Sequence, residues 1–217
     1  MKTNTRIRIS EYSQSERKRV LDILLSLFLL FVSVPGLLVF SCLILASAGW
    51  PILFTQKRLG KNKRIFTLYK FRTMRAGAEA ERDSLKKENI APAPMFKVPQ
   101  DPRFSPFGYF LSRTGIDELP QLVNVLKNDM SLVGPRPLPV TEGNALGANW
   151  GWRWQVKPGL FSYWVLSSDR YRSLEKWRQL ELRTIRIKSL KGDIVVIIRV
   201  LHQQMLFLLR YLPNIFQ

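Results

Sequence analysis

The chain has 217 residues, a formal net charge of +18 and a pI near 10.5, a balance that fits nucleic acid, an anionic membrane or a phosphorylated small molecule as partner. With 46% hydrophobic residues, it has the composition of one globular domain and not of a disordered chain. One cysteine (Cys42) and one histidine (His202) exclude a disulfide framework, a thiolate zinc site and a histidine-rich metal site, so a bound metal is expected to be a hard ion held by oxygen atoms.

The first predicted element is an apolar segment from Val20 to Gly49, in which Asp22 is the only charged residue. It is longer than the ~20 residues that cross a bilayer and longer than the ~7–15 residues of a signal-peptide core. We therefore predict a membrane segment over residues 20–49, after a basic juxtamembrane segment over 1–19 and before a single domain over 50–217.

The flanks of this segment and its central proline decide its predicted topology. Basic residues stand at both ends, from Arg17 to Arg19 before it and from Lys57 to Arg64 after it, and short basic flanks favour the cytoplasmic side. Pro35, followed by Gly36, removes a helical hydrogen bond in the middle of the run and favours a kink. We therefore predict a re-entrant helix, kinked at Pro35 and not spanning the membrane. A straight span stays open from these residues alone, because prolines are tolerated in spanning helices.

A short β-hairpin is predicted directly after the apolar segment. Its strands are expected over 52–56 and 64–74, around the turn-like sequence KRLGKNK. Residues 75–89 are charged and permit a helix, whereas the prolines of 91–102 predict a loop.

Two further helices are predicted near the end of the chain, over 173–187 and 193–212. The second has an apolar face that fits either an interfacial amphipathic helix at the membrane or an ordinary helix against the core. With the hairpin, these helices predict a helix-dominated α+β fold.

Two adjacent carboxylates, Asp117 and Glu118, precede an apolar pattern with helical spacing that includes Leu119 and Leu122. The pattern predicts a helix that begins near Asp117 or Glu118, with Pro120 in its first turn. Neighbouring side chains on a helix point about 100° apart, so the two acids suit two different roles. Acids at a helix start also act as caps, and that alternative stays open from the pair alone.

Four basic residues elsewhere are candidates for contacts with phosphate: Lys70, Arg72, Arg113 and Arg136. A Mg²⁺ ion held by a carboxylate would offset the remaining repulsion between the acids and phosphate. Together these residue types suit phosphoryl transfer. Arg136 stands between Pro135 and Pro137, whose rigidity lowers the entropy cost of presenting a guanidinium, although a plain surface turn fits the triplet too.

Five motifs stand in order along the chain: KRVLD (18–22), TQKRLGKNKRIFTLYKFRTM (55–74), DPRFSPFG (101–108), DELPQLVNVLKNDMSLVGPRP (117–137) and RWQVKPG (153–159). Through them the chain resembles the bacterial monotopic phosphoglycosyl transferases, which are initiating sugar transferases that act on polyprenyl phosphate. The resemblance covers Lys18 to about Asp193. Each motif alone is weak, whereas the set in this order is specific.

The resemblance implies transfer of sugar-1-phosphate from a nucleotide diphosphate sugar, usually a UDP-sugar, to polyprenyl phosphate. The nucleotide leaves as a monophosphate, and the reaction is the first membrane step of polysaccharide or glycoconjugate biosynthesis. By its motif position, Asp117 would be the nucleophile and a Mg²⁺ contact, and Glu118 would assist the proton and metal chemistry. Pro135, Arg136 and Pro137 would face the nucleotide, and a helix broken at Pro35 would be the re-entrant anchor.

The same resemblance implies a catalytic domain on the cytoplasmic face of the bacterial inner membrane. Its expected partners are the nucleotide-sugar donor, the polyprenyl phosphate acceptor and membrane lipid, without nucleic acid, and a homo-oligomer stays open.

Three positions depart from the family pattern. Ser112-Arg113 stands where relatives commonly carry two arginines, Val34 stands where they often carry serine before the membrane proline, and LFSYWVLSSDR (160–170) replaces a different run after Gly159. The last departure leaves open a catalytically silent scaffold. The net charge of +18 leaves open a basic protein that only binds polyanions, although the paired acids argue against it.

Overall fold

The computed structural model describes residues 9–186 and 189–211. Its α-helices are α1 (Glu16–Ala48), α2 (Pro106–Thr114), α3 (Gln121–Leu126), α4 (Val140–Asn144), α5 (Tyr163–Leu166), α6 (Leu174–Arg186) and α7 (Leu190–Tyr211). Its strands are β1 (Leu53–Leu59), β2 (Ile65–Phe71), β3 (Ser131–Val133), β4 (Leu138–Pro139) and β5 (Gly159–Phe161). Short 3-10 helices are η1 (Glu11–Gln14), η2 (Lys61–Lys63), η3 (Ala80–Arg82), η4 (Ser84–Glu88), η5 (Ile116–Glu118) and η6 (Ala148–Gln155). The helix-rich α+β class is confirmed.

The predicted hairpin is confirmed as β1 and β2, which pair antiparallel from Leu53 opposite Phe71 to Leu59 opposite Ile65. Its turn is shorter than the sequence predicted, because β1 continues through Lys57, Arg58 and Leu59. Strand β4 adds to the free edge of β1 and completes a sheet of order β2-β1-β4. A second sheet consists of β3 and β5, paired in parallel. The charged stretch 75–89 forms only the 3-10 turns η3 and η4.

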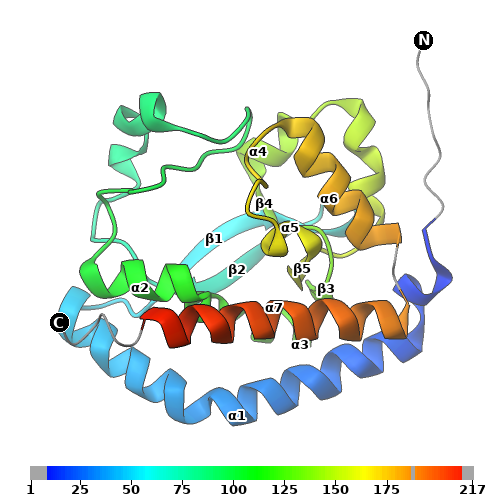
Figure 1. Cartoon of the computed structure of the whole chain (residues 1–217), viewed down its shortest axis with the longest axis horizontal. Coiled ribbons are helices and arrows are strands. Elements are labelled where there is room, and N and C mark those ends of the chain that lie inside the picture. Colours follow the sequence, from blue (N-terminus) through cyan, green and yellow to red (C-terminus); the bar gives the residue numbers. More distant parts are fainter. Residues whose placement is uncertain (1–8, 187–188, 212–217) are drawn as a thin grey trace.

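Helix α1 is one unbroken helix through Pro35, and Figure 1 shows it as a shallow V along the lower side of the molecule. It begins four residues before the predicted segment, so the basic triplet Arg17–Arg19 lies within its first turns. Large apolar side chains such as Leu24, Phe31 and Leu38 are more than half exposed along it. These features suit a helix immersed in lipid.

Helix α7 combines the two alternatives that the sequence left open, because one face packs against the core and the other face is exposed. Val196 and Val200 are buried in the core, whereas Ile198 and Met205 are exposed. It begins at Leu190, three residues before the prediction, and the predicted end at Leu212 lies outside the described residues. Helix α6 ends at Arg186, and the predicted Ile187 also lies outside them.

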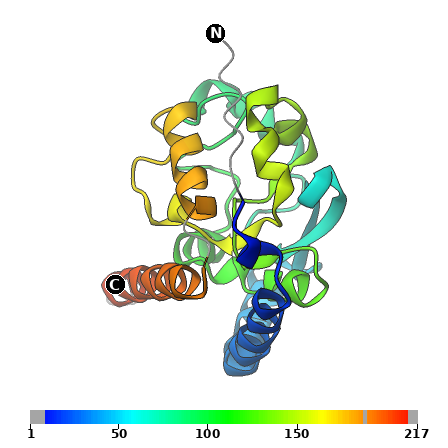
Figure 2. The same cartoon turned by 90° about the vertical axis from the view of Figure 1, so that its right-hand side faces the viewer.

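Helices α1 and α7 lie on the same side of the domain in Figures 1 and 2. Of the described residues, α1 and the stretch Leu190–Arg210 are long and apolar enough to cross a membrane by length and composition. One side of the protein therefore presents two apolar helices.

The core has three clusters. The largest joins β2, α3, β3, β5 and α7 through buried residues such as Leu68, Leu122 and Val196, and Leu25 and Leu29 of α1 pack against it. A second cluster is rich in aromatic side chains (Trp150, Trp152, Trp164 and Trp177). A third joins Ile44 of α1 to Phe71 and Leu111. Helix α1 thus packs against the domain at both of its halves.

A buried charge cluster ties α1 to the domain. Lys18 Nζ lies 2.5 Å from Asp22 Oδ1 and 2.7 Å from Asp193 Oδ2 of α7, and all three residues are buried. Asp22 Oδ1 also accepts a hydrogen bond of 3.1 Å from the backbone N–H of Leu132 in β3. The only charged residue of the apolar segment is therefore an internal anchor.

We expect Lys18→Met to lower the free energy of unfolding by about 3–5 kcal/mol, because two buried carboxylates lose their shared cation. Denaturant unfolding in detergent measures this change. The exposed neighbour Arg17 supplies the control Arg17→Met, with an expected change within about 0.5 kcal/mol. Equal effects of the two substitutions would contradict the anchoring role of Lys18.

Candidate active site

A narrow pocket of about 30 Å³ opens between the hairpin, η5 and the segment that follows β5. It is lined by Arg58, Leu68, Lys70, Glu118, Gln121, Arg136, Pro137, Gly159, Leu160, Ser162 and Val165. Of the residues predicted from sequence, Lys70, Glu118, Arg136 and Pro137 therefore meet at one pocket.

The two acids lie in the 3-10 turn η5 and not in the first turn of a helix. Gly115 ends α2 in the left-handed region (φ 75°) and reverses the chain into η5. Helix α3 begins only at Gln121, after Pro120, so the predicted helix start was too early. The hydrogen bonds of the 3-10 turn explain the error, because apolar spacing alone does not distinguish it from an α-helical turn.

Each acid has its own cation. Asp117 Oδ2 lies 3.8 Å from Lys70 Nζ, and Glu118 Oε1 lies 3.6 Å from Arg136 Nη1. The Asp117 side chain is only 6% exposed and lies behind the pocket lining, whereas that of Glu118 is 30% exposed. This geometry suits two acids with two roles.

Burial raises the pKa of the Asp117 carboxyl from 3.8 to about 7; Lys70 and Arg136 oppose the rise, and Glu118 adds to it. Because the pKa is raised on folding, the stability that this group contributes is full at low pH and is lost as the pH rises through about 7.

In metal-free protein, we expect the ¹³C carboxyl resonance of Asp117 to titrate near pH 7, and Asp117→Asn assigns it. A midpoint near 4, the ordinary range of aspartate, would contradict this environment.

The proline-arginine-proline turn is held by its backbone. Gly134 N–H donates to the Phe161 carbonyl (3.1 Å), and Gly159 N–H donates to the Pro135 carbonyl (2.9 Å). The two glycines touch so closely that a Cβ on Gly159 would lie 2.0 Å from the Gly134 nitrogen. Residues larger than glycine cannot pack here without moving the turn.

A buried ion pair supports the same turn from behind. Arg153 donates from Nε and Nη2 to the two carboxylate oxygens of Glu181, both at 2.7 Å, and it also donates to the Arg136 carbonyl. Trp177 donates to Glu181 at 3.0 Å. The RWQVKPG motif therefore positions the backbone of Arg136.

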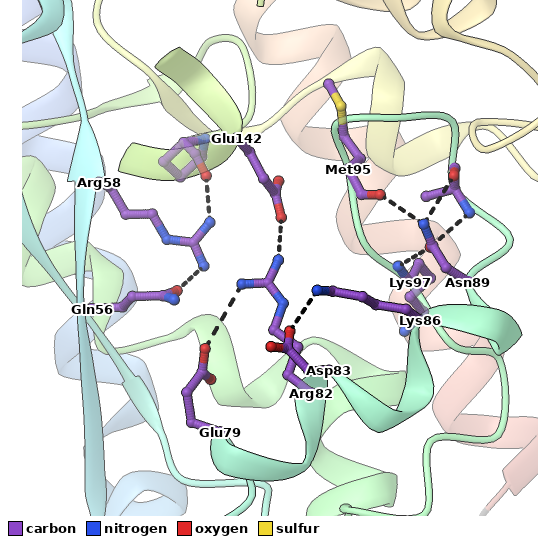
Figure 3. Close-up of polar contacts among 12 residues, drawn as sticks. Gln56, Arg58, Glu79, Arg82, Asp83, Lys86, Asn89, Met95, Lys97 and Glu142 are labelled. Atoms are coloured by element: carbon purple, nitrogen blue, oxygen red, sulfur yellow. Dashed lines mark hydrogen bonds and ion pairs between the residues drawn. The ribbon is translucent and has the colours of Figure 1, made fainter. Parts of the chain in front are cut away.

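Sequence reasoning missed an aromatic and several basic residues around the pocket. The centre of the Trp164 ring lies 4.6 Å from the guanidinium carbon of Arg136 and 4.9 Å from that of Arg170. Arg58 donates to the Pro137 carbonyl at 2.9 Å, and Figure 3 shows it beside Arg82, which pairs with Glu142 at 3.1 Å. Of these residues, only Arg58 could have been placed from the sequence, by the alternation of side chains along β1. The other contacts join segments that are far apart in the sequence.

Burial and neighbouring cations lower the pKa values of two basic groups near the pocket. Burial lowers the pKa of Lys97 to about 8, with further lowering by Arg136, Arg170 and Arg113. Burial also lowers the pKa of Arg58 to about 10, with Arg136 as the next cause. Such crowding of positive charge is typical of a site that receives an anion.

The loop that carries Lys97 is held by Asn89 (Figure 3). The Asn89 side-chain oxygen accepts from the backbone N–H of Lys97 at 2.7 Å, and its amide donates to the carbonyls of Ala91 and Met95. This confirms the loop predicted over 91–102. The same hydrogen bonds hold Lys97 within reach of the charges of Arg136, Arg170 and Arg113.

Two predicted phosphate contacts have other positions. Arg72 does not line the pocket: it is buried and donates to the carbonyls of Ala48, Gly49 (2.6 Å) and Trp50 (3.0 Å) at the end of α1. In this position Arg72 caps the end of α1, where a cation also complements the helix dipole, and its contact with phosphate stays a prediction. Arg113 is exposed over the Tyr109 ring and contributes through its charge on Lys97.

The donor set fits a weakly held Mg²⁺ ion. Within residues 9–186 and 189–211, no three histidine, cysteine or acidic side chains gather as a metal cluster. Glu118 nevertheless lines the pocket, with Asp117 directly behind the lining, and Mg²⁺ is commonly held by one or two carboxylates together with substrate phosphates. Asp117 and Glu118 would hold such an ion only together with a bound diphosphate.

Comparison with known proteins adds to this geometry. Residues 13–206 match the family model described as bacterial sugar transferase. The chain is 40% identical over 151 residues to the galactosyl transferase CpsE of Streptococcus agalactiae, and 36% identical over 154 residues to the undecaprenyl-phosphate galactose phosphotransferase of Salmonella typhimurium. It is also 32% identical over 188 residues to the UDP-glucose:undecaprenyl-phosphate glucose-1-phosphate transferase of Escherichia coli.

These matches cover 69%, 69% and 83% of this chain, but only 34%, 32% and 38% of the three relatives. The chain thus spans about a third of the length of each of them.

Proposed function

The chain belongs to the bacterial sugar transferase family, and we propose that it transfers sugar-1-phosphate from a nucleotide diphosphate sugar to polyprenyl phosphate. We propose a UDP-sugar as donor, with UMP as the released product. The observation that carries the proposal is the acid pair, in which Asp117 and Glu118 have separate cations at one strongly basic pocket. The similarity to undecaprenyl-phosphate sugar-phosphate transferases supports the same reaction.

In the first step, a carboxylate oxygen of Asp117 attacks the phosphorus that bears the sugar. The new O–P bond forms as the bond to the nucleoside monophosphate breaks, and the electron pair leaves with that nucleotide. In the second step, a phosphate oxygen of polyprenyl phosphate attacks the same phosphorus and displaces Asp117. The product is polyprenyl-diphosphate sugar.

The residues around the acid pair are assigned to contacts with the diphosphate, the nucleotide and the metal. Arg136 and Lys97 contribute positive charge for the diphosphate, and Pro135, Arg136 and Pro137 are assigned to the nucleotide side of the donor. Glu118 is assigned to proton and metal contacts. Mg²⁺, held by the acid pair and the donor, would neutralise phosphate charge.

Donor binding requires the pocket to widen. Ligand pockets commonly measure about 300–1,000 Å³, well above the pocket between the hairpin and η5. Asp117 also lies behind Lys70 and must become accessible for attack.

Donor turnover tests the proposal. The full chain in detergent is incubated with a panel of UDP-, GDP- and dTDP-sugars, with and without undecaprenyl phosphate, and nucleoside monophosphate and lipid product are measured. We expect stoichiometric UMP and lipid-linked sugar diphosphate from one or a few UDP-sugars. Failure to release any nucleotide with a broad panel would favour the silent scaffold.

Membrane topology gives a separate prediction. We propose that α1 is re-entrant and that the domain lies on the cytoplasmic face of the inner membrane, since Arg17 to Arg19 and Lys57 to Arg64 flank both of its ends. Cysteines introduced at Ser10 and at Lys63, in a Cys42→Ser background, should both be protected from an impermeant thiol reagent in intact cells. Labelling of one site but not the other would show a crossing helix.

A further inference from the structure

A second basic pocket lies away from the acid pair. It has a volume of about 210 Å³ and is lined by Gly60, Lys61, Asn62, Arg64, Phe66, Asn128, Asp129 and Lys157. Phe66 and Lys70 both belong to β2, and four residues of strand separate them by about 13 Å. The pocket is therefore distinct from the proposed donor site.

The lining carries uncompensated positive charge. Lys61, Arg64 and Lys157 face a single acid, Asp129, and among the described residues no ion pair within 4.0 Å involves any of these three cations. Lys157 instead donates to the Asn128 side-chain oxygen. Burial lowers the pKa of Lys157, and the charges of Arg19 and Lys61 lower it further, whereas Asp22 opposes the change. A concave site with this charge is typical of anion binding.

The same pocket lies beside the start of the membrane helix. Arg19 of α1 donates to the carbonyls of Val125 (2.6 Å) and Leu126 (2.7 Å) at the end of α3. The turn after α3 supplies Asn128 and Asp129 to the pocket. Figure 2 accordingly shows the cyan hairpin on the flank of the domain, above the dark blue start of α1.

From that position, α1 continues at once into its apolar, exposed face, where Val20 is 53% and Leu24 is 61% exposed. A cationic pocket beside an exposed apolar helix that lies in a bilayer would face the lipid headgroups at the membrane surface.

We propose that this pocket binds the phosphate group of an anionic phospholipid at the membrane surface where α1 enters. The inference does not require transferase activity and rests only on α1 lying in a bilayer. A bound headgroup would neutralise Lys61, Arg64 and Lys157 and hold the hairpin at a fixed height above the membrane.

The test follows backbone amide signals of the pocket by NMR in the full chain, in uncharged detergent micelles. Three ligands are titrated: dihexanoyl phosphatidylglycerol, dihexanoyl phosphatidylcholine and inorganic phosphate. We expect saturable shifts at Gly60 and Asn62 with phosphatidylglycerol and not with the other two. Equal responses to both lipids would overturn the proposal, and saturation by inorganic phosphate at the same concentration would replace the lipid by a free phosphate ligand.

Substitutions supply the second arm. The double variant Lys61→Gln/Arg64→Gln should bind phosphatidylglycerol about 30-fold more weakly, since each basic residue near an anionic lipid contributes about fivefold. The matched variant Lys86→Gln/Lys87→Gln removes the same charge from the exposed surface of η4 and should bind like the parent. Unchanged amide signals outside the pocket show that each variant is folded. Equal affinity of the two double variants would contradict the site.

Discussion

Asp117→Asn is expected to abolish nucleoside monophosphate release, with turnover reduced by about 10⁴-fold or more, the scale seen when a nucleophile is removed. The amide keeps the shape of the side chain but has no anionic oxygen to attack phosphorus. The substitution should not unfold the protein, because Asp117 is a buried carboxyl whose pKa is already raised to about 7. Stopped assays of nucleotide release, with and without polyprenyl phosphate, measure the loss.

Two further variants make this result specific. Asp83→Asn removes an exposed acid between η3 and η4 and should leave turnover unchanged. Glu118→Gln should lower turnover by a different route, because Glu118 pairs with Arg136 and is not the proposed nucleophile. Parent-like nucleotide release from Asp117→Asn would return Asp117 to a structural role in η5.

Removal of divalent metal is expected to have the second largest effect. Chelation should stop turnover, and Mg²⁺ should restore it, because two carboxylates must share a pocket with a diphosphate. The protein alone offers too few ligands for tight binding, so calorimetry should show Mg²⁺ binding that strengthens when a donor is present. Glu118→Gln should raise the Mg²⁺ concentration needed for half-maximal turnover.

The control uses the chelator already saturated with Ca²⁺, which excludes inhibition by the chelator itself. Full turnover in a preparation shown to be metal-free by elemental analysis would contradict the assignment of the acid pair to a metal.

Local patterns predicted the parts of the site that lie on regular elements. Lys70, which the sequence offered as a candidate phosphate contact, lies on β2 beside Asp117, and the two acids for which the sequence suggested different roles pair with different cations. Arg72 was offered on the same ground, but β2 ends at Phe71, and the Arg72 side chain contacts the end of α1.

Other parts of the site depend on contacts between distant segments, which no local pattern encodes. The parallel pairing of β3 with β5 brings the run after Gly159 to the proline-arginine-proline turn. Through that pairing, Trp164 comes to lie against Arg136 and Arg170. Glu181 supports Arg136 through Arg153, 28 residues away in sequence. The departure from the family pattern after Gly159 therefore lies within the site itself.

The intact mass of the protein tests the central claim most directly. The full chain is incubated with a UDP-sugar that it turns over, in the absence of polyprenyl phosphate, and is quenched in acid before mass measurement. A covalent intermediate predicts an increase equal to one sugar phosphate, located on the peptide that contains Asp117, and its disappearance when polyprenyl phosphate is added. An unmodified protein under conditions of rapid turnover, or a modification on Glu118 in its place, would contradict the account.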